Sequence, residues 1–336
     1  MNFSQQPINS VFGAASTVSD VMQGVDLTGK NIIVTGGYSG LGYQAVCAFS
    51  KAGANIVVPA RDTLRAEKTL KSLERVEVMK MDLSSSDSIT EFAQNYLNRY
   101  DSLHILINNA GIMALPDKLT DEKGIELQFS TNHLGHFQLT GLLWPALIKA
   151  GGARVVTLSS RAHRLSPIRF DDISFKREPY DRWLAYGQAK TANALFAYEL
   201  ARRAAKYNVQ SFSVHPGAIY STGLMKNMDR NAMIADGKIS ADGQANVDLS
   251  KDMKSAEQGA ATSVWCAVSP DLDGYSGQYC EDVNISPLLP LETPKMILGD
   301  PASMTRLGVD KFAANPTDAL LLWELSEALT NINYPK

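Results

Sequence analysis

The chain has 336 residues, of which 45% are hydrophobic and 20% are charged, close to the averages of folded globular proteins. This composition excludes a disordered chain, a collagen-like chain and a small disulfide scaffold. The formal net charge is −3, and no block of like charge stands out. The sequence therefore predicts no nucleic-acid partner and no basic membrane-binding surface.

The cysteines and the start of the chain bear on location. Cys47, Cys266 and Cys280 are odd in number and widely spaced, so we expect neither a disulfide framework nor a metal site. The N-terminal run MNFSQQPINS lacks the charged and apolar regions of a signal peptide. The longest apolar runs, such as 103–107, are far shorter than the ~20 residues of a membrane span. These features predict a cytoplasmic protein without a membrane span or a bound metal.

Short β-rich runs alternate with longer helical patterns along most of the chain. In chain order, the expected strands are 31–35, 55–60, 76–80, 103–107, 154–159, 210–215 and 277–281, and the expected helices are 40–51, 62–74, 86–99, 120–149, 183–206 and 256–268. Several strands are apolar throughout, which implies burial on both faces. The pattern predicts an α/β fold, a single Rossmann-type domain with a doubly wound parallel sheet of about seven strands and helices on both faces. Ligands of such sheets bind outside the carboxyl ends of the strands.

Three parts fall outside this repeat. Residues 1–29 form an N-terminal extension with a short helical pattern at 16–24, and residues 286–336 form a C-terminal extension that ends in an amphipathic helix near 318–329. Residues 220–255 are an irregular insertion that contains several methionines. Methionine adapts to irregular apolar ligands, so we expect this insertion to act as a substrate lid; the alternative is that it packs onto the core.

A glycine-rich turn follows the first expected strand and precedes a helix, with the sequence Thr35-Gly36-Gly37-Tyr38-Ser39-Gly40-Leu41-Gly42. Gly36 permits the tight turn, and Gly40 and Gly42 let the backbone and the helix N-terminus approach a pyrophosphate closely. Free N–H groups and the helix dipole favour negative charge at this point. The strand–glycine–helix context favours dinucleotide binding by Gly36, Tyr38, Ser39, Gly40, Leu41 and Gly42 over a plain turn.

The end of the second strand bears on the choice of cofactor. An acidic residue there would bind the ribose 2′-hydroxyl of NAD, whereas an arginine accommodates the 2′-phosphate of NADP. The sequence has Arg61 at this point, so we favour NADP(H) over NAD(H). The next residue, Asp62, is expected to cap the following helix.

Tyr186 and Lys190 lie four positions apart within the expected helix 183–206 and therefore share one helical face. A free tyrosine has a pKa near 10. We expect the Lys190 ammonium and a positive nicotinamide ring to lower the pKa of Tyr186, so that its phenol acts as general acid in a reduction and general base in an oxidation. Ser160 ends the fifth expected strand on the ligand side, where its hydroxyl can stabilise charge on a substrate carbonyl.

These motifs occur in order at successive strand ends, together with Asn108-Asn109-Ala110-Gly111 after the fourth strand. In this combination the chain resembles the Tyr-dependent short-chain dehydrogenase/reductase family over about residues 28–285. The runs Ala60-Arg61-Asp62, Asn132-His133-Leu134-Gly135-His136-Phe137 and Tyr279-Cys280-Glu281-Asp282 make it most similar to the retinol dehydrogenase and WW-domain oxidoreductase group.

The resemblance implies further site residues. The implied catalytic set is Asn132, Ser160, Tyr186 and Lys190, with Asn132 holding a water near the lysine. Besides the glycine loop and Arg61, the implied cofactor contacts are Asp82, Leu83, Asn109, Ala110, Gly111, Tyr186, Lys190, Pro216, Gly217, Ile219 and Ser221, with Thr222 as an alternative to Ser221 and helix capping as an alternative role for Asp82. By analogy of position, Met113, Leu115, Trp183 and Leu224 lie near the substrate carbonyl.

Two further features near the predicted site are interpreted as structural rather than catalytic. His215 has no acidic partner nearby in the sequence and is interpreted as a packed residue at a strand end. The loop 161–182 holds six basic and four acidic residues. It could steer an anionic substrate, but we favour a solvated loop.

Together these inferences predict an NADP(H)-dependent carbonyl reductase or alcohol dehydrogenase that acts on a hydrophobic ketone, aldehyde or alcohol. The alternatives are a non-catalytic NADP(H)-binding sensor or partner protein on the same fold, and a reductase of an activated C=C bond. The expected partner is a small carbonyl or alcohol substrate. A homo-oligomer formed through the helices at 120–149 and 183–206 is possible, although the C-terminal extension could cover that surface.

Overall fold

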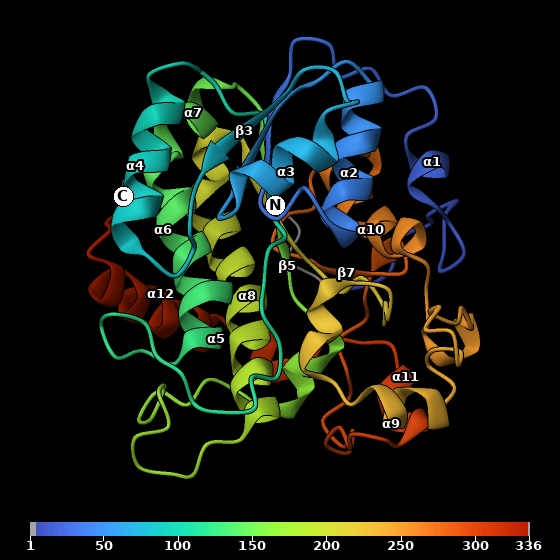
Figure 1. The fold of residues 1–336 in the computed structure, drawn as a ribbon. Helices are drawn as coiled ribbons and strands as arrows, with labels where there is room; N and C mark the ends of the chain where they lie inside the picture. Colours follow the sequence, from blue (N-terminus) through green and yellow to red (C-terminus); the bar gives the residue numbers. More distant parts are fainter. Residues whose placement is uncertain (1–4, 335–336) are drawn as a thin grey trace.

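A computed structural model describes residues 5–334, and its centre is a sheet with the strand order β3-β2-β1-β4-β5-β6-β7-β8 (Figure 1). The strands are β1 Asn31–Val34, β2 Asn55–Ala60, β3 Val76–Lys80, β4 Ile105–Asn108, β5 Ala153–Leu158, β6 Val209–Val214, β7 Tyr279–Glu281 and β8 Asn284–Ile285. Strands β1 to β7 pair in parallel, and β8 runs antiparallel to β7. The predicted doubly wound parallel sheet is confirmed, with β8 as a short addition.

The alternation of side chains along β1 explains the layers. Ile32 and Val34 pack into one hydrophobic cluster, with residues of α2 and α10, whereas Ile33 packs into the opposite cluster, with residues of α4, α6 and α8. All three side chains are fully buried. The covering helices are α2 Gly40–Lys51, α3 Thr63–Leu70, α4 Ser86–Leu97, α6 Gly135–Leu142, α7 Trp144–Lys149, α8 Arg182–Ala204 and α10 Ala256–Val268. Continuous apolar strands are thus buried on both faces, as parallel sheets require.

The single helix expected at 120–149 is wrong. The chain there forms α5 (Leu127–Phe129), a π-helical turn (Ser130–Leu134), α6 and α7. Residues 120–126 are not helical, because the Glu126 carboxylate is buried and accepts from the N–H groups of Gln128 and Phe129 to begin the helix there. Pro145 lies in the first turn of α7, where its missing N–H separates α7 from α6.

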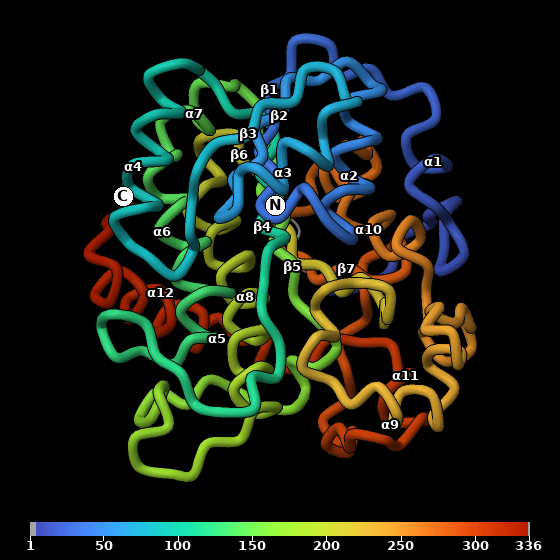
Figure 2. Tube along the Cα trace, in the orientation of Figure 1, coloured from blue at the N-terminus to red at the C-terminus, as the bar shows by residue number. Residues whose placement is uncertain are grey.

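Both late segments lie beside the carboxyl ends of the strands. The insertion contains α9 (Arg230–Ala235) and a 3-10 turn at Leu249–Lys251, and the C-terminal extension contains α11 (Pro301–Thr305) and α12 (Pro316–Thr330). Helix α11 contacts the turn Leu249–Lys251, so two segments far apart in the sequence meet near α9 (Figure 2). Helix α12 packs instead against α8, through Trp323 and Phe196.

The longest helix of the described residues is α8, with 23 residues. It carries Lys190, Glu199 and three arginines, and most of its residues are buried by protein on all sides. Neither α8 nor any other helix within 5–334 combines the length and apolarity needed to cross a lipid bilayer. Helix α8 brings Tyr186 and Lys190 to the cavity at the carboxyl ends of the strands.

Candidate active site

A cavity of about 900 Å³ runs along the carboxyl ends of the strands. Its lining comes mainly from the carboxyl ends of the strands and the segments that follow them: Thr35–Gly36 and Tyr38–Leu41 after β1, Pro59–Arg61 at the end of β2, Met81–Leu83 after β3, Asn109–Met113 after β4, Leu158–Ala162 around the end of β5, and His215–Tyr220 after β6. This is the position expected for a ligand of a doubly wound sheet. The candidate residues are brought together here from separate parts of the sequence.

The glycine turn leaves room for a ligand at the N-terminus of α2. Gly36 and Gly40 have φ values of 66° and 53°, which disfavour other residues. A Cβ on Gly42 would lie 2.6 Å from both the Asn109 side-chain nitrogen and the Gly36 carbonyl oxygen, so Gly42 permits close packing without itself lining the cavity. The N-cap residue Ser39 makes no side-chain capping hydrogen bond, so the first amides of α2 remain available to an anion.

Thr35 ties the glycine turn to the loop after β4. Its hydroxyl oxygen accepts from the backbone N–H of Asn109 (2.8 Å) and of Ala110 (2.9 Å), and the Asn109 side chain donates to the Thr35 carbonyl (2.7 Å). The same hydroxyl contacts the buried His136 ring at 2.9 Å. These hydrogen bonds fix the small residues of the loop against the glycine turn. The contact with His136 was not predicted, because His136 lies on α6, far from Thr35 in the sequence.

Two arginines line the end of the cavity beyond β2. Arg61 is there as predicted, and Arg65 accompanies it from α3. The signal available in the sequence was a second arginine four positions after Arg61, although Arg61 itself precedes α3. Asp62 caps α3 by accepting from the Arg65 N–H (3.0 Å), as expected. Asp82 also lines the cavity; its proposed capping role is wrong, because Ser85 is the N-cap of α4.

Tyr186, Ser160 and Lys190 meet at the middle of the cavity. Tyr186 is 4% exposed, and the neighbouring Ser160 side chain favours the ionised form of its phenol. Lys190 Nζ donates to the Leu158 carbonyl (2.8 Å) and lies 5.5 Å from the centroid of the Tyr186 ring. The end of β5 therefore holds both Ser160 and the lysine beside the phenol.

Burial shifts the pKa values of both Tyr186 and Lys190 in the chain without cofactor. Burial raises the pKa of Tyr186 above its ordinary value, and the neighbouring Ser160 side chain opposes only part of that effect. Burial also lowers the pKa of Lys190 to about 7. The expectation that Lys190 and a positive nicotinamide together lower the Tyr186 pKa concerns the complex with cofactor and stays a prediction; in the chain alone, desolvation has the largest influence on both groups.

Asn132 lies on the π-helical turn and contacts the backbone of a residue that lines the cavity. Its side-chain oxygen accepts from the Ile112 N–H (2.8 Å), and its side-chain nitrogen donates to the Ile112 carbonyl (2.9 Å). It is fully buried and does not line the cavity. The side chain therefore orders the chain beside Gly111, whose added Cβ would come 3.0 Å from the Asn132 oxygen.

The segment after β6 lines the cavity through Pro216, Gly217 and Ile219, as expected. Of the two hydroxyl candidates, Thr222 lines the cavity, whereas Ser221 is exposed outside the lining. His215 is buried at the end of β6, as interpreted, but the expectation that it lacks an acidic partner is wrong. Its Nε2 lies 2.9 Å from Asp252, a residue of the insertion 37 positions away, which sequence proximity does not reveal.

The substrate end is apolar. Met113, Trp183 and Leu224 line the cavity and pack around Tyr186. Leu115 does not line it, and its carbonyl instead accepts from the Tyr180 hydroxyl (3.1 Å). Met225 and Met228, from the insertion expected as a lid, also line this end, and the further apolar residues that the sequence analysis did not assign to it are Ala162, Met296, Leu298 and Met304. Several come from the C-terminal extension, which no local motif connects to the site.

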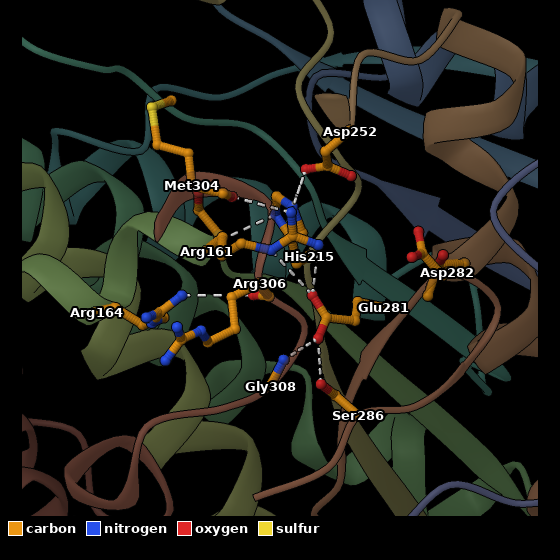
Figure 3. A network of polar contacts seen from close by, with 12 residues as sticks. Arg161, Arg164, His215, Asp252, Glu281, Asp282, Ser286, Met304, Arg306 and Gly308 are labelled. Atoms are coloured by element: carbon orange, nitrogen blue, oxygen red, sulfur yellow. Dashed lines mark hydrogen bonds and ion pairs between the residues drawn. The ribbon is translucent and has the colours of Figure 1, made fainter. Parts of the chain in front are cut away.

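The beginning of the loop 161–182 is also not solvated as expected. Residues Arg161–Leu165 form a 3-10 turn in which Arg161 and Arg164 are each only 3% exposed. Figure 3 shows the Arg161 guanidinium directed at carboxylates rather than at solvent. The reason is that Asp252 and Glu281, both distant in sequence, supply the counter-charge that allows burial.

The amino-acid sequence of this chain is similar to those of several known proteins. A family model described as "short chain dehydrogenase" matches residues 30–232. A Streptomyces antibioticus protein named "Probable oxidoreductase" is 44% identical over 264 residues, covering 77% of this chain and 86% of the relative. Retinol dehydrogenase 12 of Mus musculus is 35% identical, covering 92% and 89%. WW domain-containing oxidoreductase of Gallus gallus is 33% identical, covering 98% and 74%.

Solved structures show the same fold. A crystal structure of an uncharacterized protein from Mycobacterium paratuberculosis aligns with a TM-score of 0.70 and 29% identity, covering 97% of this chain and all of that one. Two structures at TM-scores of 0.60 are a Pseudomonas aeruginosa RhlG/NADP complex (22% identity; 77% and 96% covered) and a Brucella melitensis 3-ketoacyl-(acyl-carrier-protein) reductase with NADH (20%; 77% and 98%). The family resemblance drawn from the motifs is confirmed.

Proposed function

This chain belongs to the short-chain dehydrogenase family, and we propose that it is an NADP(H)-dependent carbonyl reductase, or the corresponding alcohol dehydrogenase in the reverse direction. The proposed substrate is an apolar ketone, aldehyde or alcohol. The observation that carries the proposal is the convergence of Tyr186, Ser160 and Lys190 on one cavity that also contains the glycine turn. Hydride transfer to a carbonyl needs a proton donor and a group that binds the carbonyl oxygen, which Tyr186 and Ser160 would supply. The buried cation Lys190 lies beside them, and the glycine turn suits a dinucleotide.

The cavity fits a nicotinamide dinucleotide. Gly36 and Gly40 adopt positive φ and leave the α2 amides open, which suits a pyrophosphate. Arg61 and Arg65 at the far end would hold a 2′-phosphate by forked hydrogen bonds. Of the two hydroxyls after β6, Thr222 is the proposed contact in place of Ser221, because it faces the cavity.

The proposed chemistry divides between the cofactor and this chain. When bound, the reduced nicotinamide supplies a hydride to the carbonyl carbon. The Tyr186 hydroxyl donates the proton to the carbonyl oxygen, and the Ser160 hydroxyl donates a hydrogen bond to the same oxygen. Lys190 stabilises the phenolate that remains, because a nearby cation favours the ionised phenol.

The walls around Tyr186 support an apolar substrate. Met113, Trp183 and Leu224 surround the phenol, with Met225 and Met228 beside them. Met side chains adapt to irregular apolar shapes. A carbonyl compound with a hydrophobic body would place its oxygen at Ser160 and Tyr186 and its remainder against this wall.

The proposal is tested by measuring NADPH oxidation through its absorbance in the presence of a panel of aromatic and aliphatic ketones. Tyr186→Phe is expected to lower kcat by about 10²–10⁴-fold, because it removes the proton donor. The dissociation constant for NADPH should stay within about twofold, because the hydroxyl is lost only from the reacting centre. Near-normal turnover in this variant would contradict the assigned role.

Tyr180→Phe is the matched control. Its hydroxyl bonds the Leu115 carbonyl outside the cavity, so turnover should be retained. NADPH binding without turnover of any ketone would favour a non-catalytic binding protein. Conversion of an enone to the saturated ketone would favour C=C reduction.

A further inference from the structure

Arg161 lies directly after the proposed catalytic Ser160 and is 3% exposed. Its Nη2 lies 2.9 Å from Glu281 Oε2, and its Nη1 lies 2.8 Å from Asp252 Oδ2. Nη1 also donates to the Met304 carbonyl at 3.1 Å. One guanidinium thus joins the end of β5 to β7, to the insertion and to the C-terminal extension (Figure 3).

Both carboxylates are themselves held by further donors. The second oxygen of Glu281 accepts from the Ser286 hydroxyl and from the Gly308 N–H (2.6 Å), which lie on either side of the segment 287–307. Asp252 Oδ2 also lies 2.9 Å from His215 Nε2. Because His215 Nδ1 accepts from the Arg161 backbone N–H (3.0 Å), the ring proton of a neutral His215 is on Nε2, where it donates to Asp252.

The segment 290–307 has little hydrophobic anchorage of its own. None of its residues is buried, and Leu291, Ile297 and Leu307 are 78%, 61% and 47% exposed. Even so, it contributes Met296, Leu298, Gly299 and Met304 to the cavity lining. Since apolar burial does not hold this wall, its position depends on polar ties: Arg161 on the Met304 carbonyl, Arg164 on the Ser303 carbonyl (3.0 Å), and Gly308 on Glu281.

We propose that Arg161 is a positioning residue that holds the segment 290–307 and Asp252 of the insertion against the substrate end of the cavity, so that this wall contacts the body of a bulky carbonyl substrate. The kinetic part of this inference rests on the proposed function. The structural part does not, since it concerns only how the wall is held.

Limited trypsin digestion tests the structural part. The segment contains two exposed cleavage sites, Lys295 and Arg306. In Arg161→Met, cleavage there should become about tenfold faster or more, because a segment that opens more often is cut more often. Arg161→Lys keeps the charge and should be intermediate, because an ammonium cannot bridge two carboxylates and a carbonyl as the planar fork does. It also serves as the folded variant if the methionine variant does not fold.

Arg154→Met is the matched control. Arg154 lies near the start of β5, whereas Arg161 follows the end of that strand; Arg154 pairs with Asp273 (2.9 Å) and does not line the cavity. Its loss should leave cleavage at Lys295 and Arg306 unchanged. Unchanged cleavage at these sites in both Arg161 variants, or equal acceleration at sites throughout the chain, would overturn the proposal.

Kinetics with a small and a bulky ketone test the substrate part. In Arg161→Lys, kcat/KM for the bulky ketone should fall by roughly tenfold to a hundredfold, mainly through KM, with NADPH affinity retained. A fall in kcat alone, equal for both ketones, would contradict a role in holding the wall. If no ketone is reduced by the natural chain, the proposed function fails, while the trypsin result still decides whether Arg161 holds the segment.

Discussion

Lys190 and Arg161 are two buried cations at the same end of β5, and their surroundings differ in one respect. Lys190 is 5% exposed, and within the described residues it has no carboxylate partner; its Nζ bonds the Leu158 carbonyl. Arg161 is 3% exposed and meets two carboxylates. Burial therefore lowers the pKa of Lys190 to about 7. Burial acts on Arg161 in the same direction, but Glu281 and Asp252 outweigh it and raise its pKa.

The difference separates a chemical role from a structural one. An uncompensated buried cation costs stability, and it attracts a developing negative charge such as a phenolate. A cation that is already paired with carboxylates attracts a further negative charge only weakly. The segments that carry those carboxylates, however, depend on the cation for their position. This difference supports the proposed roles of Lys190 at the reacting centre and of Arg161 in holding the wall around it.

The largest expected effect is on stability, and its sign should differ between the two sites. Arg161→Met should lower the free energy of unfolding by about 3–5 kcal/mol, because it leaves two buried carboxylates without their cation. Lys190→Met should raise it by roughly 1–4 kcal/mol in the cofactor-free protein at neutral pH, because a desolvated charge is removed. Urea unfolding of both variants measures these values. Equal destabilisation by the two substitutions would remove the basis of the comparison.

Low pH should lower the free energy of unfolding, because a buried histidine lies near each of the two cations. Burial lowers the pKa of His136, near Lys190, to about 4 and that of His163, near Arg161, to about 3. Unfolded histidines titrate near 6.5, so between these values the unfolded chain binds protons that the folded chain does not. Stability is therefore retained above pH ~6.5 and lost as the pH falls below it, by about 1 kcal/mol per pH unit for each histidine.

Urea unfolding between about pH 4 and 8 tests this expectation. His163→Gln should reduce the slope below pH ~6.5 and leave the slope above it unchanged, because a glutamine does not titrate. An identical acid slope in this variant would show that His163 does not contribute.

The smallest expected effect concerns a third cation, Arg61, which is exposed at the other end of the cavity. Arg61→Asp should shift the ratio of kcat/KM for NADPH over NADH towards NADH by about tenfold or more, because a charge-assisted hydrogen bond to phosphate is replaced by repulsion. Lys71→Asp makes a similar charge change outside the cavity lining and should leave the ratio unchanged. An unaltered ratio in Arg61→Asp would assign cofactor choice to other residues.

Residues close together in the sequence were predicted well, because local rules govern them. The glycine turn, the cap by Asp62 and the shared face of Tyr186 and Lys190 each depend on a spacing of a few residues. The apolar strands likewise identified the parallel sheet. The expected helix at 120–149 failed because buried Glu126, the π-helical turn and Pro145 override a continuous apolar pattern.

By itself, the sequence predicted the parallel sheet, the glycine turn that lines the cavity, and the residues that we propose as the reacting group, since hydrophobic period and turn chemistry act over short distances along the chain. Only the tertiary structure decided that Asp252 faces His215 and Arg161, that Met304 reaches the cavity, and that Tyr186 is desolvated. Burial and counter-charge depend on which distant segments come together, and no periodicity along a single chain specifies such contacts.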